Sequence, residues 1–174
     1  MLDPLKKYLR NRKLNQITPK PKSNGVNEAK SIGILFDGVD LDGRDIVEKF
    51  AAQLKKQNKK VRVLGYIGDF EDNNSMLFKS YNKKSINWLE IPQNSEVEDF
   101  VKTPFDLLFN LYEVSPAHVL YIIKASQAKL KVGIPHENRI HDLTLELKNN
   151  FNLATFIKEL TSLLNKLSGV HVNS

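Results

Sequence analysis

The chain has 174 residues, no cysteine and a formal net charge of +6. This length predicts one domain with an appendage, and the lack of cysteine excludes disulfide bonds, thiolate zinc sites and cysteine nucleophiles. No apolar run is long enough to span a bilayer, and the basic N-terminus is not followed by the apolar core of a signal peptide. We therefore expect a cytoplasmic protein with no integral membrane association.

The net positive charge lies at the start of the chain. Residues 1–30 carry eight basic and two acidic side chains, whereas residues 31–174 carry eighteen of each. The first segment predicts a short helix in which Asp3 is the cap and Pro4 the first helical residue, with leucines on one face and basic residues on the other. The prolines and glycine of residues 17–25 predict an extended linker. We divide the chain into a basic arm, residues 1–29, and a body, residues 30–174.

Strands and helices are predicted to alternate along the body. Apolar or alternating runs typical of strands occupy residues 31–36, 61–67, 86–91, 105–112, 130–134 and 143–147. Residues 68–85 have the composition of a loop. Helices are predicted over residues 43–58 after a cap at Asp42, from a capping box that begins at Ser95, from Ser115 onward, and over residues 152–167.

This alternation predicts an α/β fold. We expect a Rossmann-like three-layer sandwich whose mostly parallel sheet has about six strands in the order 3-2-1-4-5-6, preceded by the basic N-terminal helix.

Four segments carry a resemblance that covers nearly the whole chain: residues 32–37, 86–89, 105–111 and 128–133. They resemble an uncharacterised bacterial family of the Bacteroidota, a domain of unknown function. The resemblance implies a basic N-terminal helix and a Rossmann-like body, and it supplies no catalytic residues. The family has Phe-Gly after the tryptophan of an Ile-Asn-Trp stretch, where this chain has Leu89 and Glu90. Residues 105–134 also resemble a strand–helix–strand unit of heptosyltransferase-type glycosyltransferases, which implies architecture and not activity.

The basic arm indicates a polyanionic partner. Clustered cations on a helix release counterions from a phosphate backbone, and Tyr8 among them can stack on a base. The leading hypothesis is a non-enzymatic protein that contacts RNA or a ribosome-like assembly. The arm can instead lie on a membrane surface, dock its leucines on the body, or bind a protein partner or a second copy of the chain. The residues predicted to contact nucleic acid are Lys6, Lys7, Arg10, Arg12, Lys13, Lys20 and Lys22.

The predicted switch point of the sheet, between its first and fourth strands, is the second candidate. Open α/β sheets place ligands there, and the pocket is predicted to be lined by Asp37, Gly38, Asn110, Glu113 and Ser115. The alternative function is therefore an enzyme that binds a nucleotide or a sugar nucleotide. The chain has no glycine-rich phosphate-binding motif and no visible nucleophile–base pair, so we lean away from an enzyme.

The acidic loop of residues 36–45 and the histidines do not predict a metal site. The loop's carboxylates can hold Mg²⁺, but helix capping is the favoured interpretation, and an EF-hand register puts Lys49 where an acidic ligand is needed. His136 and His141 are predicted to be surface loop residues without zinc spacing, and His118 a partly exposed packing residue. We predict no metal and no cofactor.

Overall fold

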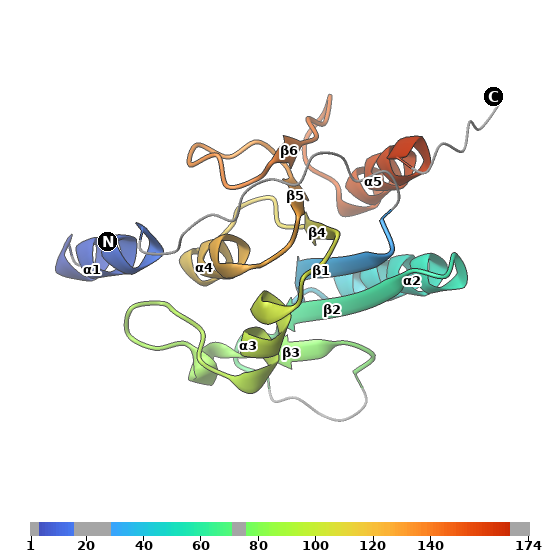
Figure 1. The fold of residues 1–174 in the computed structure, drawn as a ribbon. Helices are drawn as coiled ribbons and strands as arrows, with labels where there is room; N and C mark the ends of the chain where they lie inside the picture. The colour runs from blue at the N-terminus through green and yellow to red at the C-terminus, as the bar shows by residue number, and fades with distance from the viewer. Residues whose placement is uncertain (1–3, 16–28, 71–75, 168–174) are drawn as a thin grey trace.

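The computed structural model describes residues 4–15, 29–70 and 76–167. Within them, an all-parallel sheet of six strands has the order β3-β2-β1-β4-β5-β6, which confirms the predicted α/β architecture and strand order (Figure 1). The strands are β1 (Ser31–Asp37), β2 (Lys60–Tyr66), β3 (Lys79–Tyr81), β4 (Leu107–Asn110), β5 (Leu130–Gly133) and β6 (Leu143–Thr144).

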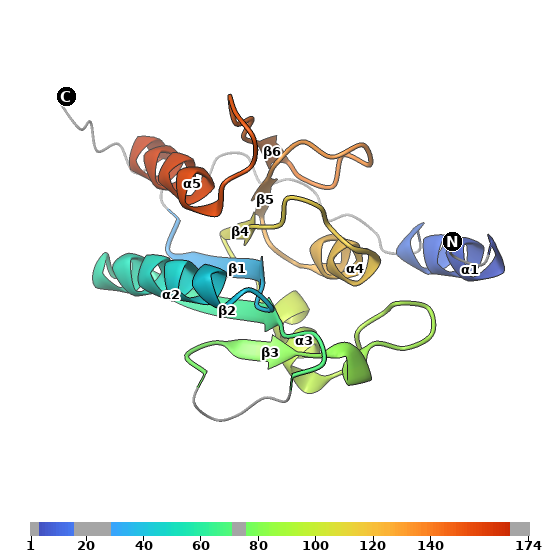
Figure 2. The ribbon, with the colours of Figure 1, turned by 180° about the vertical axis from the view of Figure 1, so that it is seen from behind.

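Helices cover both faces of the sheet. On one face lie α2 (Leu41–Lys56) and α5 (Leu153–Leu167), and on the other lie α3 (Ser95–Lys102) and α4 (Ala117–Ala125) (Figures 1 and 2). The N-terminal helix α1 (Pro4–Asn15) belongs to neither layer. It lies beyond the carboxyl ends of the strands, next to α4, in both views. The predicted linker, residues 17–25, lies outside the described residues, and the division into arm and body stays a prediction.

The central strand β1 shows why the sheet is buried on both sides. Ile34 and Phe36 point to the layer of α2 and α5, and Leu35 points to the layer of α3 and α4. Alternate side chains of a strand face opposite sides of the sheet, so an unbroken apolar run is required where both faces are covered. Gly33 lies where a Cβ would be 2.8 Å from the Phe105 ring, so this glycine lets that ring pack against β1.

The predicted strand over residues 86–91 is wrong. These residues form a tight loop because the Asn87 side chain holds two of their amides. Asn87 Oδ1 accepts hydrogen bonds from the amides of Leu89 at 2.9 Å and Ile91 at 3.0 Å. Glu90 has a φ of 62°, which no strand residue adopts. The third strand is instead β3, inside the segment predicted to be loop, and it pairs with β2 at the edge of the sheet.

Two predicted helix caps are wrong. Asp40, and not Asp42, is the cap of α2, and its carboxylate accepts from the Asp42 amide at 3.1 Å. Asn94, and not Ser95, is the cap of α3, and its Oδ1 accepts from the Val97 amide at 3.0 Å. Each of these caps satisfies an amide of the first turn that has no partner within the helix.

Candidate functional site

Two residues of the predicted switch-point pocket are joined by a hydrogen bond. Asn110 ends β4 and is 1% exposed, and its Nδ2 donates to Ser115 Oγ at 2.9 Å. The same amide group lies 3.1 Å from His141 Nε2, while His141 Nδ1 lies 2.9 Å from the carbonyl oxygen of Ile134. Asn110 has only donors on Nδ2, so His141 Nε2 accepts and its Nδ1–H donates. A partly buried relay from Ile134, directly after β5, through His141 and Asn110 therefore fixes the position of the Ser115 hydroxyl.

His141 is held in its neutral form. Burial lowers its pKa to about 4. It packs over Gly133, where a Cβ would lie 2.8 Å from the imidazole Cδ2. His141 is therefore a loop residue, as predicted, but it is half-buried and not at the surface, because its ring fills the space that the missing side chain of Gly133 leaves.

The other three predicted pocket residues lie apart from this relay. Asp37 is exposed at the end of β1 and accepts from the Val39 amide at 3.0 Å, and the Gly38 amide donates to the Tyr66 carbonyl oxygen at 2.8 Å. These contacts form the turn between β1 and α2. Glu113 borders a separate shallow pocket of about 300 Å³ that also includes Pro135. The proposed ligand contacts of these residues stay predictions.

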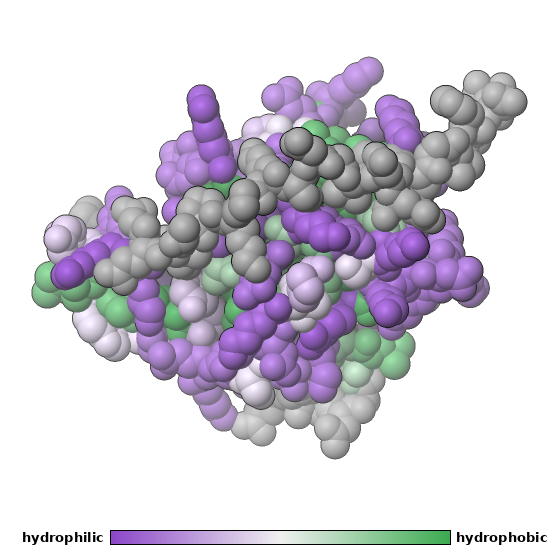
Figure 3. All heavy atoms as spheres, viewed as in Figure 1, coloured by the Kyte–Doolittle hydropathy of each residue, from purple (hydrophilic) through white to green (hydrophobic). Residues whose placement is uncertain are grey.

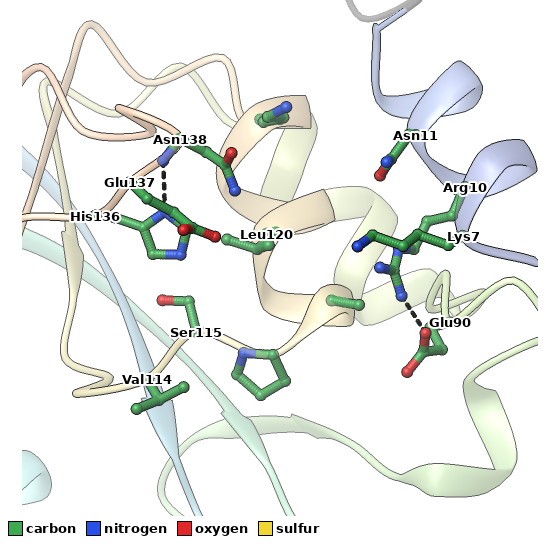
Figure 4. Close-up of a pocket in the computed structure, with 13 residues that line it drawn as sticks. Lys7, Arg10, Asn11, Glu90, Val114, Ser115, Leu120, His136, Glu137 and Asn138 are labelled. Carbon is green, nitrogen blue, oxygen red and sulfur yellow. Dashed lines mark hydrogen bonds and ion pairs between the residues drawn. The ribbon is translucent and has the colours of Figure 1, made fainter. Parts of the chain in front are cut away.

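A cleft of about 860 Å³ lies beside Ser115 (Figure 4). The outward face of α4 forms its floor, with Leu120 and Lys124 one turn apart. The loop between β5 and β6 forms one wall, and α1 forms the other. The remaining lining residues are Lys7, Arg10, Asn11, Glu90, Val114, Ser115, Pro116, Ala117, His136, Glu137 and Asn138. The basic arm and one residue of the predicted pocket, Ser115, thus line the same cavity although they are far apart in the sequence.

Arg10 holds α1 against the body. It is 9% exposed, and its guanidinium forms an ion pair with the Glu90 carboxylate (Figure 4). Glu90 lies in the Asn87 loop and has a left-handed backbone conformation, which residues other than Gly, Asn and Asp rarely adopt. The helix therefore docks through a cation. Of the predicted leucine stripe, Leu5 is 59% exposed and Leu9 is half-buried, so docking of the leucines on the body stays a prediction.

The remaining cations of α1 are turned toward solvent or the cleft. Lys7, Arg12 and Lys13 are exposed, Lys6 is half-buried, and Tyr8 is 63% exposed. Tyr8 and Arg12 are four residues apart, so they share a helix face. In Figure 3, polar residues cover most of the coloured surface in view, and hydrophobic residues are visible at the end where α1 lies and in smaller groups elsewhere. Lys20 and Lys22 lie outside the described residues.

A group of aromatic side chains at the carboxyl edge was not expected from the sequence. Tyr81, at the end of β3, lies with its hydroxyl 2.8 Å from His118 Nδ1, and Tyr112, after β4, donates to the Phe36 carbonyl oxygen at 2.8 Å. Burial lowers the pKa of His118 to about 4 and raises the pKa of Tyr81 well above its usual value. The signal in the sequence is a tyrosine at or just after the end of three strands, Tyr66 included. These contacts connect β3 to α4 and satisfy the buried polar groups.

Metal ligands do not gather in this part of the molecule. Among the residues that the structure describes, no group of three or more His, Asp or Glu side chains is arranged to hold a metal ion. Within the same ranges, no helix has the length and apolar character needed to cross a membrane.

Comparison with protein families matches residues 5–167 to DUF6913, a family of unknown function. The chain belongs to this family. The DUF6913 match begins inside α1 and ends at the last residue of α5, so it includes both the docked helix and the body. No protein with a curated description matches the chain. The resemblance to a family of unknown function is thereby confirmed, and the resemblance to glycosyltransferases stays a prediction.

Proposed function

We propose that this DUF6913 chain is a non-enzymatic protein that binds RNA, alone or in a ribosome-like assembly, through the outer face of α1. The observation that carries the proposal is that one cation of α1 binds the body while other cations of the helix stay exposed. Arg10 is used internally against Glu90 and Lys7 lines the cleft, which leaves Arg12 and Lys13 as exposed cations beside Tyr8.

The exposed face combines the two features that single-stranded nucleic acid needs. Arg12 and Lys13 supply charge for the phosphates, and Tyr8 supplies an aromatic face for a base. Free helices of twelve residues are marginal in water, so docking by Arg10 keeps these groups in a fixed arrangement. The body then acts as a rigid support for the helix. A cytoplasmic location, which the cysteine-free sequence favours, would give such a protein access to RNA.

The test is binding of a fluorescent single-stranded RNA to the full chain, measured by anisotropy at several salt concentrations. Two phosphate contacts, from Arg12 and Lys13, predict a slope of log K against log salt of about −1.4. Arg12→Glu combined with Lys13→Glu is expected to weaken binding at least about tenfold, and Tyr8→Ala by a similar factor.

A matched control exists within the chain. Lys55 and Lys56 occupy the last turn of α2, as Arg12 and Lys13 occupy the last turn of α1. Reversal of charge at Lys55 and Lys56 is expected to leave RNA binding unchanged. Equal losses in the two double variants, or full binding by the α1 variant, would contradict the proposal.

A further inference from the structure

The cleft between α1 and α4 contains two hydrogen-bond donors that have no acceptor among the described residues. The first is the Ser115 hydroxyl. Its oxygen already accepts from Asn110 Nδ2 at 2.9 Å, which leaves its proton to be donated elsewhere. Ser115 lines the cleft, and Figure 4 shows its hydroxyl on the side away from α1.

The second donor is His136. The Asn138 amide donates to His136 Nδ1 at 3.1 Å, so the neutral ring carries its proton on Nε2. In Figure 4 the Nδ1 side of the ring faces Asn138, and the opposite nitrogen is turned toward the part of the cleft that holds Ser115. Both donors are therefore fixed by a backbone or side-chain partner behind them.

Two lysines add positive charge to the same cleft. Lys7 extends from α1, and Lys124 lies on the floor formed by α4. No carboxylate is paired with either ammonium within the described ranges. Arg10 and Glu90 neutralise each other, so Glu137 is the one remaining acidic group in the lining. The cleft therefore offers donors and net positive charge to a ligand.

We propose that this cleft binds a small phosphomonoester. A phosphate group is a strong acceptor with three free oxygens and a charge of about −1.5 to −2 near neutral pH. It can therefore accept from both donors and attract both lysines. The apolar surface of Leu120, Val114 and Ala117 is available to the organic part of the ligand. The volume lies within the range of small-molecule sites. This inference does not rest on RNA binding, because it uses neither Tyr8 nor Arg12.

The test is a titration of the full chain, followed by ¹H–¹⁵N correlation spectra, with inorganic phosphate, phenyl phosphate and benzoate as separate probes. We expect saturable shifts at Ser115 and at His136 through Asn138 with both phosphates, tighter binding of phenyl phosphate, and weaker binding of benzoate. Tighter binding of inorganic phosphate would identify a free phosphate site and overturn the phosphomonoester assignment.

Paired variants separate the cleft from the general charge of the protein. Ser115→Ala and Lys124→Gln are each expected to weaken phenyl phosphate about tenfold, whereas Ser162→Ala and Lys158→Gln on exposed positions of α5 leave it unchanged. Lys124 is outside the Asn110 relay, so its variant tests the cleft even if Ser115→Ala unfolds. No saturable shift in the tens of millimolar, or equal losses in the control variants, overturns the proposal. RNA binding is expected to be unaffected by Ser115→Ala.

Discussion

Lys129 donates a hydrogen bond from Nζ to Asp106 Oδ1 at 2.7 Å, and this contact connects the amino ends of β4 and β5. The other carboxylate oxygen accepts from the amides of Lys30 at 2.8 Å and Ser31 at 2.9 Å, at the start of β1. One carboxylate therefore joins three strands at the edge of the sheet opposite the candidate site.

Asp106 is expected to make the free energy of unfolding depend on pH in the acidic range. Partial burial raises its pKa, but the hydrogen bonds from Lys129 and from the Lys30 and Ser31 amides outweigh burial and lower the pKa to about 2. Its contribution is therefore complete above the ordinary value of 3.8 and is lost as the pH falls toward 2. Asp106→Ala is expected to cost about 1–3 kcal/mol at pH 7, measured by urea unfolding. A variant that is destabilised equally at pH 7 and pH 2 would contradict the assignment.

The buried histidines predict a second pH effect at milder acidity. Burial lowers the pKa of both His118 and His141 to about 4, from an ordinary value of 6.5. Between these two values the unfolded chain binds more protons than the folded chain, so the free energy of unfolding falls as the pH drops from 6.5 to 4. His118→Gln is expected to lose less stability than the parent chain between pH 7 and pH 5. Urea midpoints at the two pH values give the comparison, and an unchanged pH dependence in the variant would exclude His118 as a cause.

The ion pair between Arg10 and Glu90 predicts that α1 can be released without unfolding the body. Arg10→Ala is expected to speed amide exchange and tryptic cleavage in α1, because a lone helix of this length is marginal, and to cost about 1–3 kcal/mol of docking free energy. Arg12→Ala, at an exposed position of the same helix, is the control. If α1 is equally protected in both variants, Arg10 does not hold it.

Glu90 allows the ion pair to be separated from backbone strain. Glu90→Ala and Glu90→Gly both remove the carboxylate, but only glycine adopts a φ of 62° without cost. The glycine variant is therefore expected to be more stable than the alanine variant by about 1 kcal/mol, measured by thermal or urea unfolding. Equal stability of the two variants would show that the loop relaxes when the ion pair is absent.

Gly133 tests whether His141 is required in its present place. Gly133→Ala puts a methyl group into the imidazole and is expected to displace it from Asn110, at a cost of about 1–3 kcal/mol. The double variant Gly133→Ala, His141→Ala gives the new methyl group space. It is expected to be no less stable than His141→Ala alone. A further loss in the double variant would place the clash elsewhere.

The sequence predicts the buried parts of the fold well, because burial on two faces requires a visible apolar run. The runs that contain Ile34 and Phe109 are strands in the centre of the sheet, in the predicted order. It predicts β3 poorly because a three-residue edge strand is too short to show a period. Residues 86–91 alternate as a strand does, yet the side chain of Asn87 supplies the hydrogen bonds that turn the chain back.

The candidate site is predictable only in part. Ser115 is expected near a ligand because it follows a central strand, and it does line the cleft. Lys7, Glu90 and His136 reach the same cavity from segments that are far apart in the sequence, and no local pattern records that they meet. The pairing of Arg10 with Glu90 spans eighty residues. A count of charges along the sequence therefore predicts that Arg10 contacts nucleic acid, whereas in the structure it pairs with Glu90.

The ion pair that fastens α1 also connects the two proposed binding events thermodynamically. Arg10 and Lys7 belong to the helix that carries the outer basic face, and both line the cleft. A polyanion that drew Arg10 away from Glu90 would remove one wall of the cleft and lower its affinity for a small phosphate. By reciprocity, a molecule bound in the cleft would stabilise the docked position of α1 and would lower the affinity for the polyanion by the same factor.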